Sequence, residues 1–197
     1  MIARLAQRLA SFLLVTYGRL LWGVYPAIMP AVVERLGPLK ALWWMTAQLP
    51  RYTLTFRRLG PMRANLLYAL ASLLNGCSYC VYAHGRAFQL HYFREKGSVF
   101  PIDEHGLVAL GSATDAELVA ELESAFRRAG LPEELARFRR LYALKLEGAV
   151  PSGREDAMLT HAIAMYDVLN YCAIAGQTPL DDAHDPINRD RPLKERY

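Results

Sequence analysis

The feature that most constrains the fold is an apolar run, residues 62–74, with turn-forming residues on both sides. Gly60 and Pro61 precede the run, and Asn75 and Gly76 follow it. Proline is favoured in the first turn of a helix, and an Asn-Gly pair tolerates the left-handed backbone that commonly ends one. Apolar residues recur three and four positions apart and none is β-branched, which predicts a buried helix.

Residues typical of helix starts and helix ends also divide the rest of the chain into predicted helices. Thr114 is followed three residues later by Glu117, and Ser152 by Glu155, a spacing typical of a capping box at a helix N-terminus. No segment alternates apolar and polar residues as a half-buried strand would. The sequence therefore predicts an all-α fold, a bundle of seven or eight helices. They are expected at about residues 1–23, 31–36, 39–49 (ended by Pro50), 62–74, 77–95, 114–130, 132–148 and 152–176.

The length of 197 residues favours one domain over two. Within this domain, residues 1–40 are expected to form an N-terminal helical extension. Residues 177–197 are polar and contain several prolines, so we expect a C-terminal tail that is extended or partly disordered.

Residues 1–23 predict a basic amphipathic helix, because apolar and basic side chains fall on different arcs at 100° per residue. One interpretation is a helix that packs on its own domain or on a neighbouring subunit. The other is a helix that lies on a membrane surface. The apolar arc holds Leu5, Leu9, Phe12, Leu13, Thr16 and Leu20, and the polar arc holds Arg4, Arg8, Ser11 and Arg19.

Composition disfavours several classes of protein. The net charge is +4, but no dense run of lysine or arginine indicates nucleic-acid binding. The sequence contains no stretch of about 20 uncharged apolar residues, so no membrane span is predicted. Arg19 interrupts the apolar N-terminal run, which disfavours a signal peptide. Three cysteines are too few for a disulfide-stapled secreted domain, so we expect a cytoplasmic protein.

The residues that point to chemistry are Cys77, Cys80 and His84. On a helix that begins at Cys77, all three side chains fall within about 60° of one another. A place in the first turn of a helix, a Cys-x-x-Cys spacing and a nearby histidine each lower the pKa of a thiol. The spacing therefore predicts a redox-active dithiol.

The segment Asn-Gly-Cys-Ser-Tyr-Cys-Val-Tyr-Ala-His, residues 75–84, resembles the active-site helix of the alkylhydroperoxidase D-like (carboxymuconolactone decarboxylase) superfamily. That helix carries Cys-x-x-Cys-x-x-x-His, often after an Asn-Gly pair. The resemblance covers about residues 62–90 and extends more weakly over 154–176, where Asn170 matches an asparagine of a later family helix. It implies an all-helical fold, a homo-oligomer (a trimer or a multiple of it, or a dimer), and an antioxidant peroxidase or disulfide reductase that needs no metal or cofactor.

Carried over to this chain, the resemblance makes Cys80 the thiolate that attacks the peroxide, and Cys77 the proton donor and resolving thiol. His84 would belong to the proton relay that activates Cys80. The family's peroxidases carry a glutamate twelve positions before the first cysteine, where this chain has Asn65. An amide does not accept a proton at neutral pH, so Asn65→Glu is expected to raise peroxide reduction if no other group replaces the base. Tyr68 and Tyr79 are candidates to supply a hydroxyl.

Several alternatives remain open. Cys77 and Cys80 could be buried structural thiols, or could bind zinc together with His84 and either His91 or His161. The chain could also be a non-redox lactone decarboxylase of the same superfamily, or a redox-sensing interaction protein. The preferred hypothesis is a thiol oxidoreductase whose partners are a hydroperoxide or disulfide substrate and an external thiol reductant.

Overall fold

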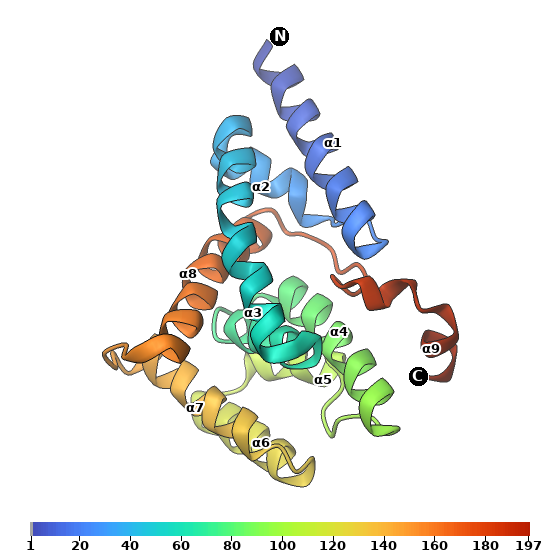
Figure 1. Cartoon of the computed structure of the whole chain (residues 1–197). Helices are drawn as coiled ribbons and strands as arrows, with labels where there is room; N and C mark the ends of the chain where they lie inside the picture. Colours follow the sequence, from blue (N-terminus) through green and yellow to red (C-terminus); the bar gives the residue numbers. More distant parts are fainter. Residues whose placement is uncertain (1) are drawn as a thin grey trace.

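The computed structural model describes residues 2–197, whose regular secondary structure is entirely helical (Figure 1). The predicted all-α class is confirmed. Nine α-helices and two short 3₁₀ helices cover the described residues. They are α1 Ile2–Trp22, α2 Ile28–Leu36, α3 Pro38–Leu73, α4 Ser78–Lys96, α5 Glu104–Ala109, η1 Leu110–Ser112, α6 Asp115–Arg128, α7 Pro132–Leu146, α8 Gly153–Ala175, η2 Pro186–Arg189 and α9 Arg191–Arg196.

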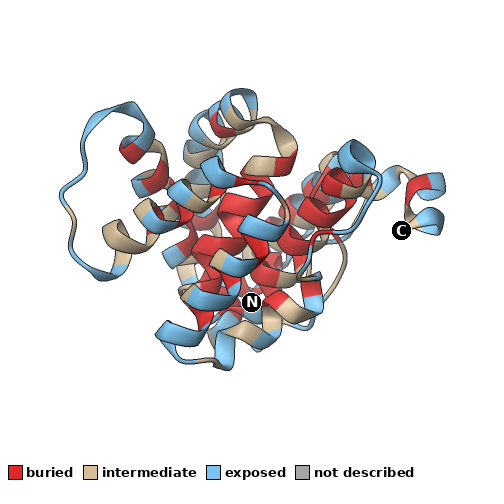
Figure 2. Ribbon diagram, turned by 90° about the horizontal axis from the view of Figure 1, so that it is seen from below, coloured by how far each residue is buried: buried red, intermediate tan, exposed pale blue. Residues whose placement is uncertain are grey.

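The centre of the molecule is the second half of α3, packed against α4 and α8. Every residue from Ala64 to Leu73 is buried, and α4 is buried along most of its length. Figure 2 shows that the buried residues gather in the middle of the molecule. The main hydrophobic core also takes in side chains of α1, α2, α6 and α7. The N-terminal extension therefore shares its core with the rest of the chain.

Helix α3 spans a region where the sequence predicted two helices. The prediction that Pro50 ends a helix was wrong, because Pro50 lies inside α3 and the backbone leaves helical geometry only at Gly60 (φ 76°, ψ 161°). Proline removes one hydrogen bond from a helix without forbidding its continuation. Met45 and Tyr52, on either side of Pro50, both pack against the main core, which keeps the chain helical through it.

The two predicted capping boxes have different outcomes. Thr114 and Glu117 form one at the start of α6, as predicted. Ser152 makes no side-chain cap at α8, and its expected partner Glu155 is not involved. Instead, Asp156 accepts a hydrogen bond of 2.7 Å from the Ser152 backbone N–H and binds Arg140 on α7, which ties the start of α8 to that helix.

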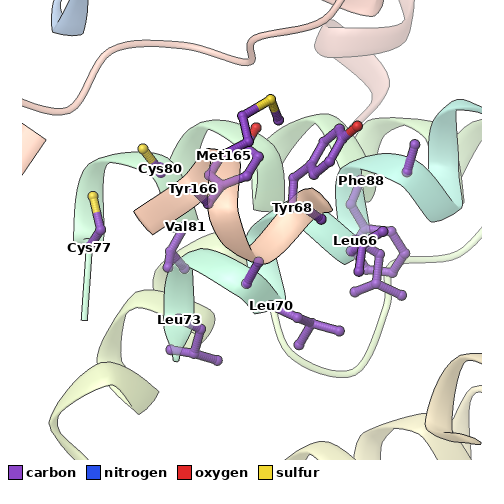
Figure 3. Close-up of a cluster of buried hydrophobic side chains, with 14 of the residues drawn as sticks. Leu66, Tyr68, Leu70, Leu73, Cys77, Cys80, Val81, Phe88, Met165 and Tyr166 are labelled. Carbon is purple, nitrogen blue, oxygen red and sulfur yellow. The ribbon is translucent and has the colours of Figure 1, made fainter. Parts of the chain in front are cut away.

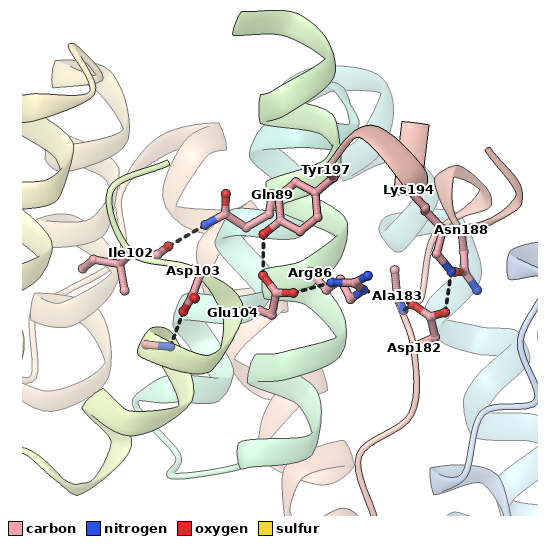
Figure 4. A network of polar contacts seen from close by, with 11 residues as sticks. Arg86, Gln89, Ile102, Asp103, Glu104, Asp182, Ala183, Asn188, Lys194 and Tyr197 are labelled. Carbon is pink, nitrogen blue, oxygen red and sulfur yellow. Dashed lines mark hydrogen bonds and ion pairs between the residues drawn. The ribbon is translucent and has the colours of Figure 1, made fainter. Parts of the chain in front are cut away.

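The expectation of an extended or disordered C-terminal tail was wrong. Within this segment Pro186–Arg189 forms η2 and Arg191–Arg196 forms α9, and Ala183, Ile187 and Leu193 make a second small core with Ala87 and Leu90 of α4. Polar contacts fasten the same segment to α4 and α5 (Figure 4). The Tyr197 hydroxyl donates to Glu104 (2.7 Å), Lys194 donates to Asp182 (2.6 Å), and Arg86 of α4 binds both carboxylates.

Helix α1 forms as predicted, but it buries a different face from the apolar arc. Ala10, Leu14 and Gly18 are buried, with Gly18 packed so closely on Pro26 that an added Cβ would lie 2.4 Å from its ring. Leu5 and Phe12 are exposed. Within residues 2–197, no helix has both the length and the apolar character needed to cross a bilayer.

The close approach of α8 to α2 gives a stability prediction. A Cβ at Gly176 would lie 2.6 Å from the Cβ of Ala31, so Gly176→Ala should push the end of α8 away from α2. We expect a loss of about 1–3 kcal/mol in the free energy of unfolding, measured by denaturant titration. Gly111→Ala is the matched control, because its new Cβ would meet only Leu73, at 3.8 Å, and an equal loss there would contradict the packing argument.

Candidate functional site

The two cysteines of the Cys-x-x-Cys segment lie at the start of α4, as predicted. Gly76 adopts a left-handed conformation (φ 67°) that turns the chain after α3, and Cys77 is the extended N-cap residue of α4. The Cys77 carbonyl accepts the first helical hydrogen bond, from the N–H of Val81 (3.0 Å). Cys80 therefore lies in the first turn, and Figure 3 shows both sulfurs pointing to the same side of the helix.

Both thiols are buried and unbridged, with exposed fractions of 1% for Cys77 and 3% for Cys80. A hydrogen bond from the Cys80 side chain, aided by the backbone N–H groups of Cys80 and Tyr79, lowers the pKa of Cys77 even though burial opposes this. Burial and the neighbouring Cys77 raise the pKa of Cys80. The pair therefore loses its first proton from Cys77, and Cys80 keeps the second proton in contact with that thiolate.

His84 is held on both ring nitrogens. Its Nδ1 lies 2.9 Å from Oδ1 of Asn65, and its Nε2 lies 2.5 Å from the hydroxyl of Tyr166 on α8. The Asn65 amide nitrogen donates to the Pro61 carbonyl and to Asp185, so its oxygen must accept from His84. The proton of His84 is therefore on Nδ1, and Nε2 accepts from Tyr166, whose pKa burial raises.

Burial, followed by the proximity of His184, lowers the pKa of His84 to about 3. Its folded pKa thus lies below the ordinary value of about 6.5, and the ring stays uncharged at any pH above about 3. We expect the NMR resonances of His84 to show no titration between about pH 5 and pH 8. Exposed His105 is the control, and a midpoint for His84 near 6.5 would contradict the burial argument.

Asn65 connects His84 to a buried carboxylate from the C-terminal segment. Its Nδ2 donates to Asp185 Oδ2 (2.8 Å), and Asp185 Oδ1 accepts from Nε2 of His91 (2.9 Å). Burial raises the pKa of Asp185, but His91, the N–H of Ile187 and the amide of Asn65 together outweigh burial and hold this pKa below the ordinary value. A negative charge therefore lies one amide away from His84.

A second polar cluster surrounds Tyr79, which lies between the two cysteines. The Tyr79 hydroxyl donates to Asp181 (2.7 Å) and lies 3.0 Å from Nε2 of His184. Asp181 also accepts from the backbone N–H of Ala27 (2.9 Å), at the start of α2. The His184 ring stacks on Trp22 of α1, with 4.9 Å between ring centroids. This cluster joins the Cys-x-x-Cys segment to both N-terminal helices.

An apolar pocket of about 70 Å³ opens onto Cys80 and His84. It is lined by α1, α2, α3, α4 and α8, mostly through leucine, methionine and aromatic side chains such as Trp44. Tyr166 and His184 also reach the pocket, but Cys77 does not line it. A small molecule in the pocket would therefore meet the sulfur of Cys80 and not that of Cys77.

The other residues considered for the site lie elsewhere. His91 binds Asp185, and His161 binds Gln48 (2.9 Å), so neither is placed to join the cysteines around zinc. Over residues 2–197, no group of three or more His, Cys, Asp or Glu side chains is arranged to hold a metal ion. Tyr68 lies edge-on to His84, at 5.5 Å between centroids, and the hydroxyl bonded to His84 belongs to Tyr166.

Four residues of the site were missed from the sequence: Tyr166, Asp181, His184 and Asp185. Three of them lie in the segment that was expected to be an extended tail. A signal was present there, since Asp185 directly precedes Pro186 and caps η2 through a hydrogen bond from the N–H of Ile187. Such a pattern indicates an ordered turn but does not say what the turn packs against.

Comparisons with models of protein families, with curated proteins and with solved structures give no match to this chain. The site is therefore defined by its own chemistry. It consists of a buried, unbridged dithiol at the start of a helix, an uncharged histidine fixed by Asn65 and Tyr166, and an apolar pocket that reaches one of the two sulfurs.

Proposed function

We propose that this protein is a thiol-dependent oxidoreductase of the alkylhydroperoxidase D-like kind, which reduces an organic hydroperoxide with the Cys77/Cys80 dithiol. The observation that carries the proposal is the position of Cys80, which lines an apolar pocket beside His84 and lies in the first turn of α4, on the same side of the helix as Cys77 (Figure 3). A structural pair of thiols would need no such pocket.

The reaction begins with the pair holding one proton. This proton passes from Cys80 to Cys77, and the Cys80 thiolate attacks the terminal oxygen of the hydroperoxide. The O–O bond breaks, the alkoxide takes the proton from Cys77 and leaves as an alcohol, and Cys80 becomes a sulfenic acid. The Cys77 thiolate then attacks the Cys80 sulfur and releases hydroxide, which leaves as water after taking a proton from solvent. The dithiol is oxidised by two electrons to a disulfide, and the peroxide is reduced by two.

The groups around the pocket suit this substrate. The Tyr166 hydroxyl donates to His84, but its oxygen can still accept a hydrogen bond from the hydroperoxide O–H. The apolar walls suit a hydrocarbon substituent. A small organic hydroperoxide is favoured over a protein disulfide because both sulfurs are almost fully buried. Cytoplasmic location and assembly into a homo-oligomer stay predictions, which fractionation and light scattering can check.

The cycle is completed by an external thiol donor, which reduces the Cys77–Cys80 disulfide by exchange and is itself oxidised to a disulfide. The test is steady-state consumption of tert-butyl hydroperoxide with dithiothreitol as donor. We expect turnover that Cys172→Ser leaves unchanged, since Cys172 is buried on α8 and lies outside the pocket. A rate no higher than that of dithiothreitol alone would refute peroxidase function.

A further inference from the structure

The outer face of α1 is apolar and exposed. Leu5, Phe12 and Leu20 have exposed fractions of 67%, 66% and 68%, although α1 itself is firmly attached through its other face. Its C-terminal carbonyls at Arg19 and Leu20 accept hydrogen bonds from Arg189, and Trp22 stacks on His184. The outer face thus belongs to an ordered helix. We define it as Ile2, Leu5, Leu9, Phe12, Leu13, Tyr17 and Leu20.

Positive charge lies along one edge of this face. Arg4, Arg8 and Arg19 are exposed on α1, which contains no acidic residue. Residues 1–73 hold nine lysines or arginines and one acidic residue, Glu34, whereas the rest of the chain has more acidic than basic residues. The apolar face and the positive charge are therefore concentrated at the same end of the sequence.

We propose that the outer face of α1 binds an anionic lipid surface, with its apolar side chains in the headgroup region and its arginines on lipid phosphates. An amphipathic helix with leucine and phenylalanine on one face and arginine beside it suits this environment. A second copy of the chain is a poorer occupant, because α1 offers no carboxylate to a partner's arginines and like charges would repel.

The pocket beside Cys80 lies next to the outer face of α1. Tyr17 belongs to the outer face of α1 and also lines the pocket, together with Leu21 and Trp22 of the same helix. Figure 1 shows α1 standing out from the body of the molecule, away from α6 and α7. A docked bilayer would therefore lie next to the pocket, and, on the proposed function, acyl-chain hydroperoxides would be within its reach.

The test is co-sedimentation of the full chain with vesicles of phosphatidylcholine alone and of phosphatidylcholine mixed equally with phosphatidylglycerol. We expect binding to the mixed vesicles, and binding that weakens at higher ionic strength. Arg4→Gln and Arg8→Gln should each lower the affinity about fivefold, and Leu9→Asp combined with Phe12→Asp should lower it more than about tenfold.

The controls are Arg128→Gln and Val150→Asp, exposed positions far from α1 in sequence, which should bind like the parent chain. Circular dichroism must show that each variant keeps its helix content. Three results would overturn the proposal: no binding to the mixed vesicles at low salt, equal losses in the controls, or a dimer that only Leu9→Asp/Phe12→Asp dissociates. None of these measurements involves the thiols. Failure of the lipid-binding proposal can therefore be distinguished from failure of the peroxidase proposal.

Discussion

Cys80→Ser should lower the rate of tert-butyl hydroperoxide reduction by about a thousandfold or more, whereas Cys77→Ser should still permit one reaction per chain. Cys80 is the only one of the two sulfurs that lines the pocket, and a serine hydroxyl does not ionise near neutral pH. Without Cys77, Cys80 can still be oxidised, but no sulfur remains beside it to form the disulfide.

The two variants are told apart by mass spectrometry with a 1,3-dione reagent, which labels sulfenic acids. We expect the label on Cys80 in Cys77→Ser and no label on Cys77 in Cys80→Ser. The competing hypothesis is that Cys77 attacks the peroxide, because Cys77 is the cysteine whose pKa is lowered. Sulfenic acid on Cys77 in Cys80→Ser would show that the thiolate formed at rest, and not the sulfur facing the pocket, attacks the peroxide.

Asn65→Glu alone should destabilise the protein by about 2–5 kcal/mol, whatever its effect on peroxide reduction. The amide nitrogen of Asn65 lies 2.8 Å from Oδ2 of Asp185, and both side chains are buried. A second carboxylate there would face the first, so the pair could not stay fully ionised. Unfolding in denaturant measures this loss.

The double variant Asn65→Glu/Asp185→Asn should regain most of that stability, because the new amide at position 185 can donate to the new carboxylate. The carboxylate would then accept directly from Nδ1 of His84, and we expect peroxide turnover to rise about tenfold over Asp185→Asn. Asp185→Asn is the matched control, since it removes the charge alone. If Asn65→Glu were as stable as the parent chain and faster, the carboxylate of Asp185 would not be the group that disfavours a second carboxylate at position 65.

The parts of the fold that local signals determine could be predicted from the sequence. The left-handed conformation of Gly76 turns the chain after α3, and Cys77 follows as the N-cap residue of α4. The capping box at Thr114 was equally local. Each depends on neighbours within a few residues, so that no knowledge of tertiary packing is needed.

The groups that complete the site could not be predicted, because they come from far along the chain. Asp185 meets Asn65 across 120 positions, and Tyr166 meets His84 across 82. The polar composition of 177–197 favoured a solvated tail, yet Asp181 pairs with His184, and Asp185 pairs with His91 of α4. On α1, periodicity identified the apolar face correctly but could not show that a different face packs inward.

The central claim is that Cys77 and Cys80 are one redox couple, and its most direct test is the product of mild oxidation. After treatment with one equivalent of tert-butyl hydroperoxide, thiol counting and peptide mass spectrometry should find two thiols lost per chain, a Cys77–Cys80 disulfide, and a free Cys172. Unreacted thiols at 77 and 80, or oxidation of Cys80 to a sulfinic acid with Cys77 still free, would contradict it.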